Sequence, residues 1–184
     1  VPILFKDTKE KVLKKANELK KKLGKYNALL DERDDYSPGW KFNEWEMKGI
    51  PLRIEIGPQD LKKRSVVLVR RDTGKKEIVK FTQLGNKVNS VLDDIQSSLY
   101  NKAKKLLNNS VAFVNTLNDL KKSIKNKKIV KTFWCGNQKC EDSIKYESGG
   151  AKSLNMPFDQ PKKFGKCVYC SKDGKNLIYF GKSY

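Results

Sequence analysis

The sequence contains no histidine in its 184 residues. This absence removes the usual general base, every Ser-His-Asp or Cys-His catalytic arrangement and any metal site with an imidazole ligand. No apolar run approaches the length of a membrane span, and no charged-then-apolar leader is recognisable. A glycine-rich phosphate loop is also missing, which disfavours a small α/β enzyme working with paired carboxylates.

Positive charge, by contrast, is abundant. The chain has 40 lysines and arginines against 21 acidic residues, a net charge of +19. This surplus is either solvated on a lysine-rich surface or matched by a polyanion, of which a nucleic acid is the most obvious. Because lysine is a weakly specific point charge, the composition predicts affinity for such a partner and not the reading of its sequence.

The apolar pattern predicts two modules. Up to about residue 107, the order strand, helix, strand, helix, three strands and helix predicts an α/β sandwich. Its mixed sheet should be mostly parallel, with one antiparallel hairpin strand. After an interruption at Asn108–Ser110, a further helix is expected from Val111 to Ile124. From about Ile129 the strands shorten and all four cysteines appear. The predicted division is therefore 1–107, a helical connector at 108–128, and 129–184.

The cysteines form two close pairs. Four residues separate Cys135 from Cys140, and two separate Cys167 from Cys170. Two such pairs can supply four thiolates to a tetrahedral zinc ion, a closed and therefore structural site. Two disulfides or four free thiols are the alternatives, and disulfides would require an oxidising compartment. The pattern favours zinc, whose binding would be coupled to the folding of so small a module.

The stretch from Asp31 to Asp60 is the most informative part of the chain. Ser37-Pro38 predicts the start of a helix and Gly49 its end. Phe42 and Glu46, four residues apart, share one helical face. The following LRIEI predicts a strand with Arg53 and Glu55 on one side. Core packing is the alternative interpretation for the helix aromatics Trp40, Phe42 and Trp45.

The residues PGWKFNEWEMKGIPLRIEIGPQDL resemble the anticodon-binding domain of class IIa aminoacyl-tRNA synthetases, and in particular that of the prolyl-tRNA synthetase family. The pattern CGNQKC…CVYC and the ending YFGKSY are similar to the C-terminal zinc-binding domain of the archaeal and eukaryotic type of that family. Histidyl-, glycyl- and threonyl-tRNA synthetases share the first domain but not this tail. The resemblance, which covers essentially the whole chain, implies a three-layer α/β anticodon-binding domain with a mixed sheet, followed by a small α+β zinc-binding domain.

The resemblance also implies a function for the parent protein, the ATP-dependent ligation of proline to tRNA(Pro). That reaction needs ATP and magnesium in a catalytic domain whose motifs this chain lacks. Because the chain opens at Val1 without a methionine, we expect it to be a fragment. The family further implies a cytoplasmic homodimer with structural zinc. It also implies that Tyr184 contributes near the parent's catalytic domain.

By the same resemblance, Phe42, Glu46, Arg53 and Asp60 occupy anticodon-contacting positions, with Lys75 following in the hairpin. Gln59 stands where a basic residue is expected, which puts that contact in doubt.

The chemistry of guanine suits these residue types. Proline anticodons carry guanines at their second and third positions. The Watson–Crick edge of guanine offers two parallel donors to a carboxylate, whereas an arginine fork suits its O6 and N7 acceptors. Alternatively, Glu46 and Arg53 form only a surface ion pair and Asp60 only caps a turn. The rival function is a free-standing zinc-ribbon protein that binds nucleic acid through lysine charge.

Overall fold

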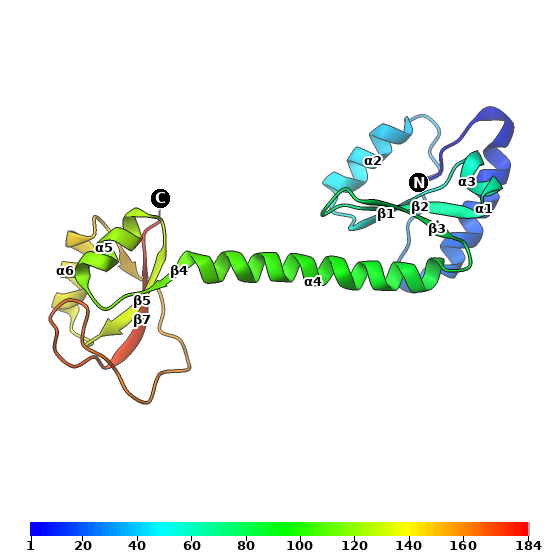
Figure 1. Cartoon of the computed structure of the whole chain (residues 1–184). Coiled ribbons are helices and arrows are strands. Elements are labelled where there is room, and N and C mark those ends of the chain that lie inside the picture. The colour runs from blue at the N-terminus through cyan, green and yellow to red at the C-terminus, as the bar shows by residue number, and fades with distance from the viewer. Residues whose placement is uncertain (184) are drawn as a thin grey trace. The chain divides into compact units, whose positions relative to one another are not determined.

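The computed structural model describes residues 1–183 and divides into two compact units, Val1–Asn101 and Lys102–Tyr184 (Figure 1). The prediction for Tyr184 lies outside the described residues. Among residues 1–183, none of the helices combines the length and the apolar character needed to cross a bilayer.

The first unit surrounds a three-stranded sheet of order β1-β2-β3. The strands are β1 (Leu52–Glu55), β2 (Ser65–Arg70) and β3 (Lys76–Lys80). The α-helices are α1 (Lys9–Lys22), α2 (Pro38–Met47), α3 (Pro58–Lys62) and α4 (Leu84–Ser110), and the 3-10 helices are η1 (Lys6–Thr8) and η2 (Gly24–Tyr26).

Alternation along β1 places α2 and the core on opposite faces of this sheet. Leu52 and Ile54 pack against the buried core formed with α1, α4 and β2. Arg53 and Glu55 point the other way, where Arg53 contacts residues of α2. Figure 1 accordingly shows α2 on the opposite side of the strands from α4. The first unit therefore has three layers, as the resemblance implies.

The mixed α/β character is confirmed, but the expectation of mostly parallel pairing is wrong. β1 pairs antiparallel with β2, and β2 with β3. Parallel pairing appears in the bridge between Pro2 and Ile56. The connections explain the difference, since β1 and β2 are joined through only the short α3, and parallel neighbours need a longer crossover. The second strand of the predicted order, which falls at residues 26–30, is also not formed, and η2 ends there at Asn27 in the left-handed conformation, with φ 53°.

The second unit has a four-stranded sheet of order β4-β5-β7-β6. Its strands are β4 (Val111–Phe113), β5 (Ile129–Trp134), β6 (Lys152–Ser153) and β7 (Asn176–Gly181), and its helices are α5 (Leu117–Lys125) and α6 (Gln138–Glu147). β4 pairs parallel with β5, and the other two pairings are antiparallel. Leu120 of α5, Ile144 of α6 and Phe180 of β7 lie in one fully buried core.

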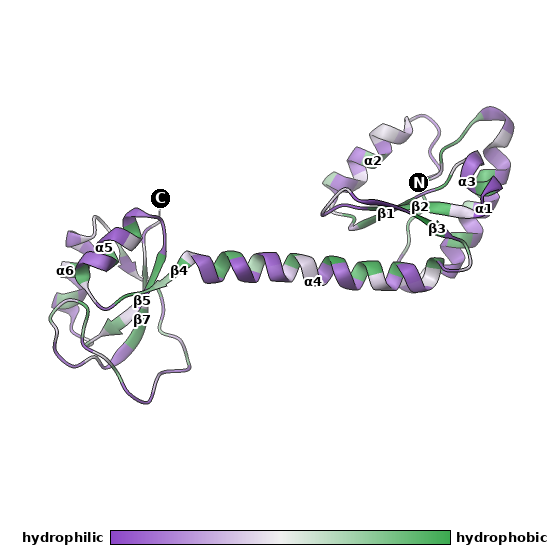
Figure 2. Cartoon of the chain, in the orientation of Figure 1, coloured by the Kyte–Doolittle hydropathy of each residue, from purple (hydrophilic) through white to green (hydrophobic). Residues whose placement is uncertain are grey.

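The region predicted as a connector is arranged differently. α4 continues to Ser110, and Val111 starts the strand β4, where the sequence predicted a helix. Figure 2 shows apolar and polar residues mixed along α4. The next helix begins at Leu117, after Thr116 accepts a hydrogen bond from the Asp119 backbone N–H at 3.1 Å. Pairing of β4 with β5 outweighs the helical spacing of Val111 and Val114, and β4 and α5 both belong to the second unit.

Candidate nucleic-acid interface and metal centre

The helix α2 begins and ends as the sequence predicts. The Ser37 hydroxyl accepts a hydrogen bond from the Trp40 backbone N–H at 3.3 Å, and Pro38 occupies the first turn. Gly49, with φ +83°, follows the last turn in a conformation that favours glycine. These signals fix where the helix begins and ends.

Three of the predicted RNA-contacting side chains lie together between α2 and β1. The Arg53 guanidinium stacks on the Phe42 ring at 4.1 Å from its centroid. It also donates to Glu46 Oε1 and pairs with Glu55 Oε1 at 3.0 Å. The Arg53 side chain is 10% exposed and that of Glu46 is 46% exposed. A fixed cation, a ring and a partly free carboxylate therefore meet at one surface of α2.

The other two predicted contacts are placed differently. Asp60 lies at the start of α3, where its Oδ2 accepts from the Gly57 backbone N–H at 2.8 Å. This is the turn-capping contact that the sequence offered as the alternative. Lys75 is exposed beside Gly74 in the β2–β3 turn, and Gln59 is exposed on α3. The ion-pair alternative also describes a real contact, because Glu46 does pair with Arg53.

A buried charge cluster on another face of α2 was missed in the sequence. Asp31 is 6% exposed and accepts from Arg33 Nε at 2.8 Å, Arg33 Nη2 at 2.7 Å and Trp45 Nε1 at 2.8 Å. Lys41, only 2% exposed, donates to the Arg33 carbonyl and lies 3.9 Å from Asp31. The hydrogen bond from Arg33, with help from Trp45 and the charge of Lys41, holds the pKa of Asp31 well below its usual range.

The aromatic residues of α2 do not form the closed core that was the alternative interpretation. Trp40 is 45% exposed, and Phe42 and Trp45 are half-buried. Lys41 instead occupies the buried position. The run of acidic residues before Ser37 was the available signal for this cluster. An acidic side chain that becomes buried on folding, as Asp31 does, needs a cationic partner. The sequence does not reveal that one of those cations would be the buried Lys41.

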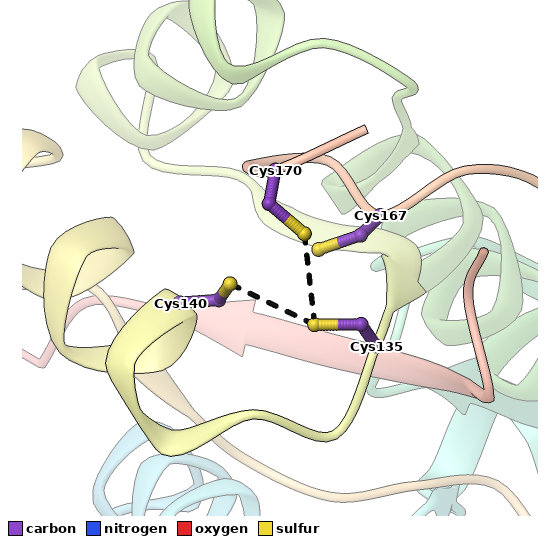
Figure 3. Close-up of side chains that lie close together, drawn as sticks. All are labelled: Cys135, Cys140, Cys167 and Cys170. Carbon is purple, nitrogen blue, oxygen red and sulfur yellow. Dashed lines mark hydrogen bonds between the residues drawn. The ribbon is translucent and has the colours of Figure 1, made fainter. Parts of the chain in front are cut away.

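The four cysteines meet in the second unit, as Figure 3 shows. Cys135 follows β5, Cys140 lies in α6, and Cys167 and Cys170 lie in the loop before β7. All four sulfur atoms lie within 4.8 Å of one another. Cys135 Sγ is 3.6 Å from Cys140 Sγ and 3.8 Å from Cys170 Sγ. No disulfide joins any two of these four cysteines, so the disulfide alternative does not describe this arrangement.

These sulfur spacings fit a metal ion. A tetrahedron with metal–sulfur bonds of about 2.3 Å has edges of about 3.8 Å. Burial raises the pKa of Cys140 to about 12 and also raises the pKa of Cys167, whereas a hydrogen bond from the Lys172 backbone lowers the pKa of Cys170 to about 7. Buried thiolates without a cation are therefore disfavoured. The cluster could hold one metal ion through four sulfur ligands.

Two family models match the chain, each over one of its units. The family described as "Anticodon binding domain" matches residues 1–90. The family described as "Prolyl-tRNA synthetase, C-terminal" matches residues 117–184.

Curated relatives match along almost the entire chain. A protein of Clostridium botulinum named "Proline--tRNA ligase" is 46% identical over 177 residues, which is 96% of this chain and 37% of that protein. "Proline--tRNA ligase" of Alkaliphilus oremlandii is 43% identical, and "Proline--tRNA ligase 2" of Bacillus cereus is 42% identical, with the same two shares. The chain thus spans about 37% of the length of these relatives. Its anticodon-binding and C-terminal domains belong to the prolyl-tRNA synthetase family.

Proposed function

We propose that this chain is the tRNA-selecting part of a proline–tRNA ligase and that it reads the two guanines shared by proline anticodons. The catalytic domain that uses ATP and magnesium would lie in the remainder of the parent protein. The names of the relatives and the two domain matches support this assignment. The parent would work in the cytoplasm as a homodimer, with Tyr184 reaching its catalytic domain.

The observation that carries the proposal is the contact of Arg53 with both Phe42 and Glu46. The Phe42 ring offers a surface on which an unpaired base can stack. The Glu46 carboxylate can accept the two parallel donors of a guanine, and the Arg53 fork can donate to guanine acceptors. Asp60 and Lys75 extend the proposed contact surface at α3 and at the hairpin.

Glu46→Ala tests base reading. We expect binding of a proline anticodon stem-loop to weaken by roughly 1–3 kcal/mol, while binding to a scrambled loop barely changes. Fluorescence anisotropy with labelled stem-loops would measure both. Glu10→Ala, which removes an exposed carboxylate from α1, is the matched control.

Equal losses on the two RNAs would contradict base reading. If the unchanged chain binds both loops equally, with a steep dependence on salt, the free-standing zinc-ribbon function is favoured instead.

We also propose that the four-cysteine cluster holds zinc in a structural role. The chemistry of the ligands supports zinc, because thiolate sulfur suits it and the sulfur spacings match its tetrahedron. Four protein ligands leave no open position for water, so the ion would cross-link the loops and take no part in catalysis. Elemental analysis should find one zinc per purified chain, and a metal-free chain with an unchanged second unit would contradict the role.

A further inference from the structure

A stacked pair of exposed aromatic rings lies on the far flank of α2 from Glu46. The Tyr36 and Trp40 ring centroids are 4.0 Å apart and their planes are inclined by 17°. Tyr36 is 38% exposed and Trp40 is 45% exposed. Other rings of the chain are more exposed, but here two large rings adjoin, and contiguous exposed apolar surface is typical of binding sites.

The pair is held rigidly from beneath. The Arg33 guanidinium lies 4.9 Å from the Tyr36 centroid and 5.3 Å from that of Trp40. Arg33 is itself fixed by ion pairs to Asp31 and Glu44. The two rings therefore form a short stack beside a cation, and the outer face of such a stack is a surface on which an unpaired base can be added.

The position of the pair relates it to the proposed reading site. Residues advance by about 100° around a helix, so Trp40 and Phe42 lie on opposite flanks of α2. Between the two flanks runs an exposed crest formed by Gly39, Asn43 and Met47. A side-chain-clad helix is about 10–12 Å wide. Neighbouring nucleotides whose bases are splayed apart can cover that span.

We propose that Tyr36 and Trp40 form a stacking platform for the first nucleotide of the anticodon. This proposal rests on the proposed function, because the second and third nucleotides would occupy the site at Phe42, Glu46 and Arg53. The first nucleotide differs among proline anticodons, so its site must accept every base. Stacking meets this requirement, since each base has a π-face and no hydrogen-bonding pattern is read.

The surroundings of the platform are compatible with a base. Tyr36 borders an open hollow of about 430 Å³ that is also lined by Asp34, Asp35 and Lys9. Lys9 is already paired with Asp34. Lys6, Arg33 and Lys41 line the same hollow, so its charge is mixed, and Asp35 offers an acceptor to the amino-bearing edge of a base.

The test is a binding cycle with two RNAs and the whole chain. One RNA is the proline anticodon stem-loop, and the other carries an abasic site at the first anticodon position. Trp40→Ala should weaken binding of the intact loop by roughly 5- to 150-fold and leave binding of the abasic loop unchanged. Trp40→Phe should retain most of the affinity, and Ile78→Ala, which removes an exposed apolar side chain from β3, is the control.

Equal losses on the intact and the abasic loop would overturn the platform. If Trp40→Ala unfolds the first unit, the platform is tested by comparing how the unsubstituted chain binds the two RNAs. That chain must bind the abasic loop more weakly than the intact loop by a similar factor, and equal binding overturns the proposal. The proposed function fails separately, when the unchanged chain does not distinguish a proline loop from a scrambled one.

Discussion

Both units pack helices on small sheets, yet different interactions stabilise the interior of each unit. In the first unit, α1, β2 and α4 contribute to a continuous apolar core. The second unit has a smaller core and adds four cysteines whose sulfur atoms lie within 4.8 Å of one another. Small domains bury too little apolar surface to be very stable alone. The comparison shows a first unit stabilised by burial and a second whose small core is accompanied by a cysteine cluster that could hold a cross-linking metal ion.

Their charges differ as well. The second unit carries eighteen lysines, no arginine and six acidic residues, whereas the first carries 22 basic and fifteen acidic residues. Arginine forms bidentate pairs of defined geometry, and lysine is a mobile point charge. Arg33, Arg53 and Arg70 all form such networks in the first unit. The first unit therefore carries charged groups of fixed geometry, whereas the charge of the second unit comes from lysine alone.

Removing the proposed metal ion should have the largest effect, because it should act on the second unit alone. Chelation, or Cys140→Ser, should unfold the second unit and leave the first intact, because zinc supplies about 10–16 kcal/mol to small thiolate domains. Two-dimensional NMR spectra would show which amide signals collapse. Tyr146→Ser, an exposed change in the same helix α6, should have no such effect. Retention of the dispersed signals of β5 and β7 without metal would contradict the dependence.

Asp31→Asn should act on the first unit alone. The substitution removes the carboxylate that Arg33 and Lys41 share, and of the two cations Arg33 keeps its ion pair with Glu44. Breaking a buried pair costs about 3–5 kcal/mol, and partial exposure of Arg33 reduces this to about 2 kcal/mol. Urea unfolding followed by tryptophan fluorescence would measure the change. Asp35→Asn, at an exposed carboxylate, should change the unfolding free energy by less than about 0.5 kcal/mol.

The contribution of Asp31 to stability should also depend on pH. The folded-state pKa of Asp31 is lowered, so its contribution is fully present above the unfolded pKa of about 4 and is lost as the pH falls below that value. The unfolding free energy of the first unit should therefore drop between about pH 4 and pH 2. Asp31→Asn should flatten this part of the pH profile. An identical acid slope in the variant would assign the loss to other carboxylates.

Ser65→Ala should have the smallest effect. Ser65 is fully buried at the start of β2, and its hydroxyl has no hydrogen-bond partner within residues 1–183. Removing an unsatisfied polar group is neutral or stabilising, here by up to about 1 kcal/mol. Thermal unfolding of the first unit would show the shift. A destabilised variant would indicate that the hydroxyl has a partner after all.

Local signals predicted the elements near the site well. Ser37-Pro38 and Gly49 identified α2, and Gly74 identified the turn of the β2–β3 hairpin. The cysteine spacing predicted the meeting of all four sulfur atoms, because each pair is anchored within a few residues. Periodicity placed Phe42 and Glu46 on one helical face and Arg53 on one side of its strand, whereas their grouping into one site came from the resemblance.

Features that depend on tertiary pairing were not predictable in this way. Whether Val111 joins a helix or a strand is decided by β5, which lies far along the chain. The burial of Lys41 depends on Asp31 and Arg33 folding back against α2. Sequence periodicity also gave the wrong strand direction in the first sheet, because direction is set by how the connections run and not by side-chain alternation.

The contact between Glu55 and Arg53 affects how much side-chain freedom would be lost on binding. Two nitrogens of the guanidinium lie 3.0 Å from Glu55, so its plane is oriented before any RNA arrives. Side-chain freedom that is lost on folding does not have to be lost again on binding. The surface beside α2 is thus preorganised, and under the proposed function a base would have only to displace water and share the carboxylate of Glu46.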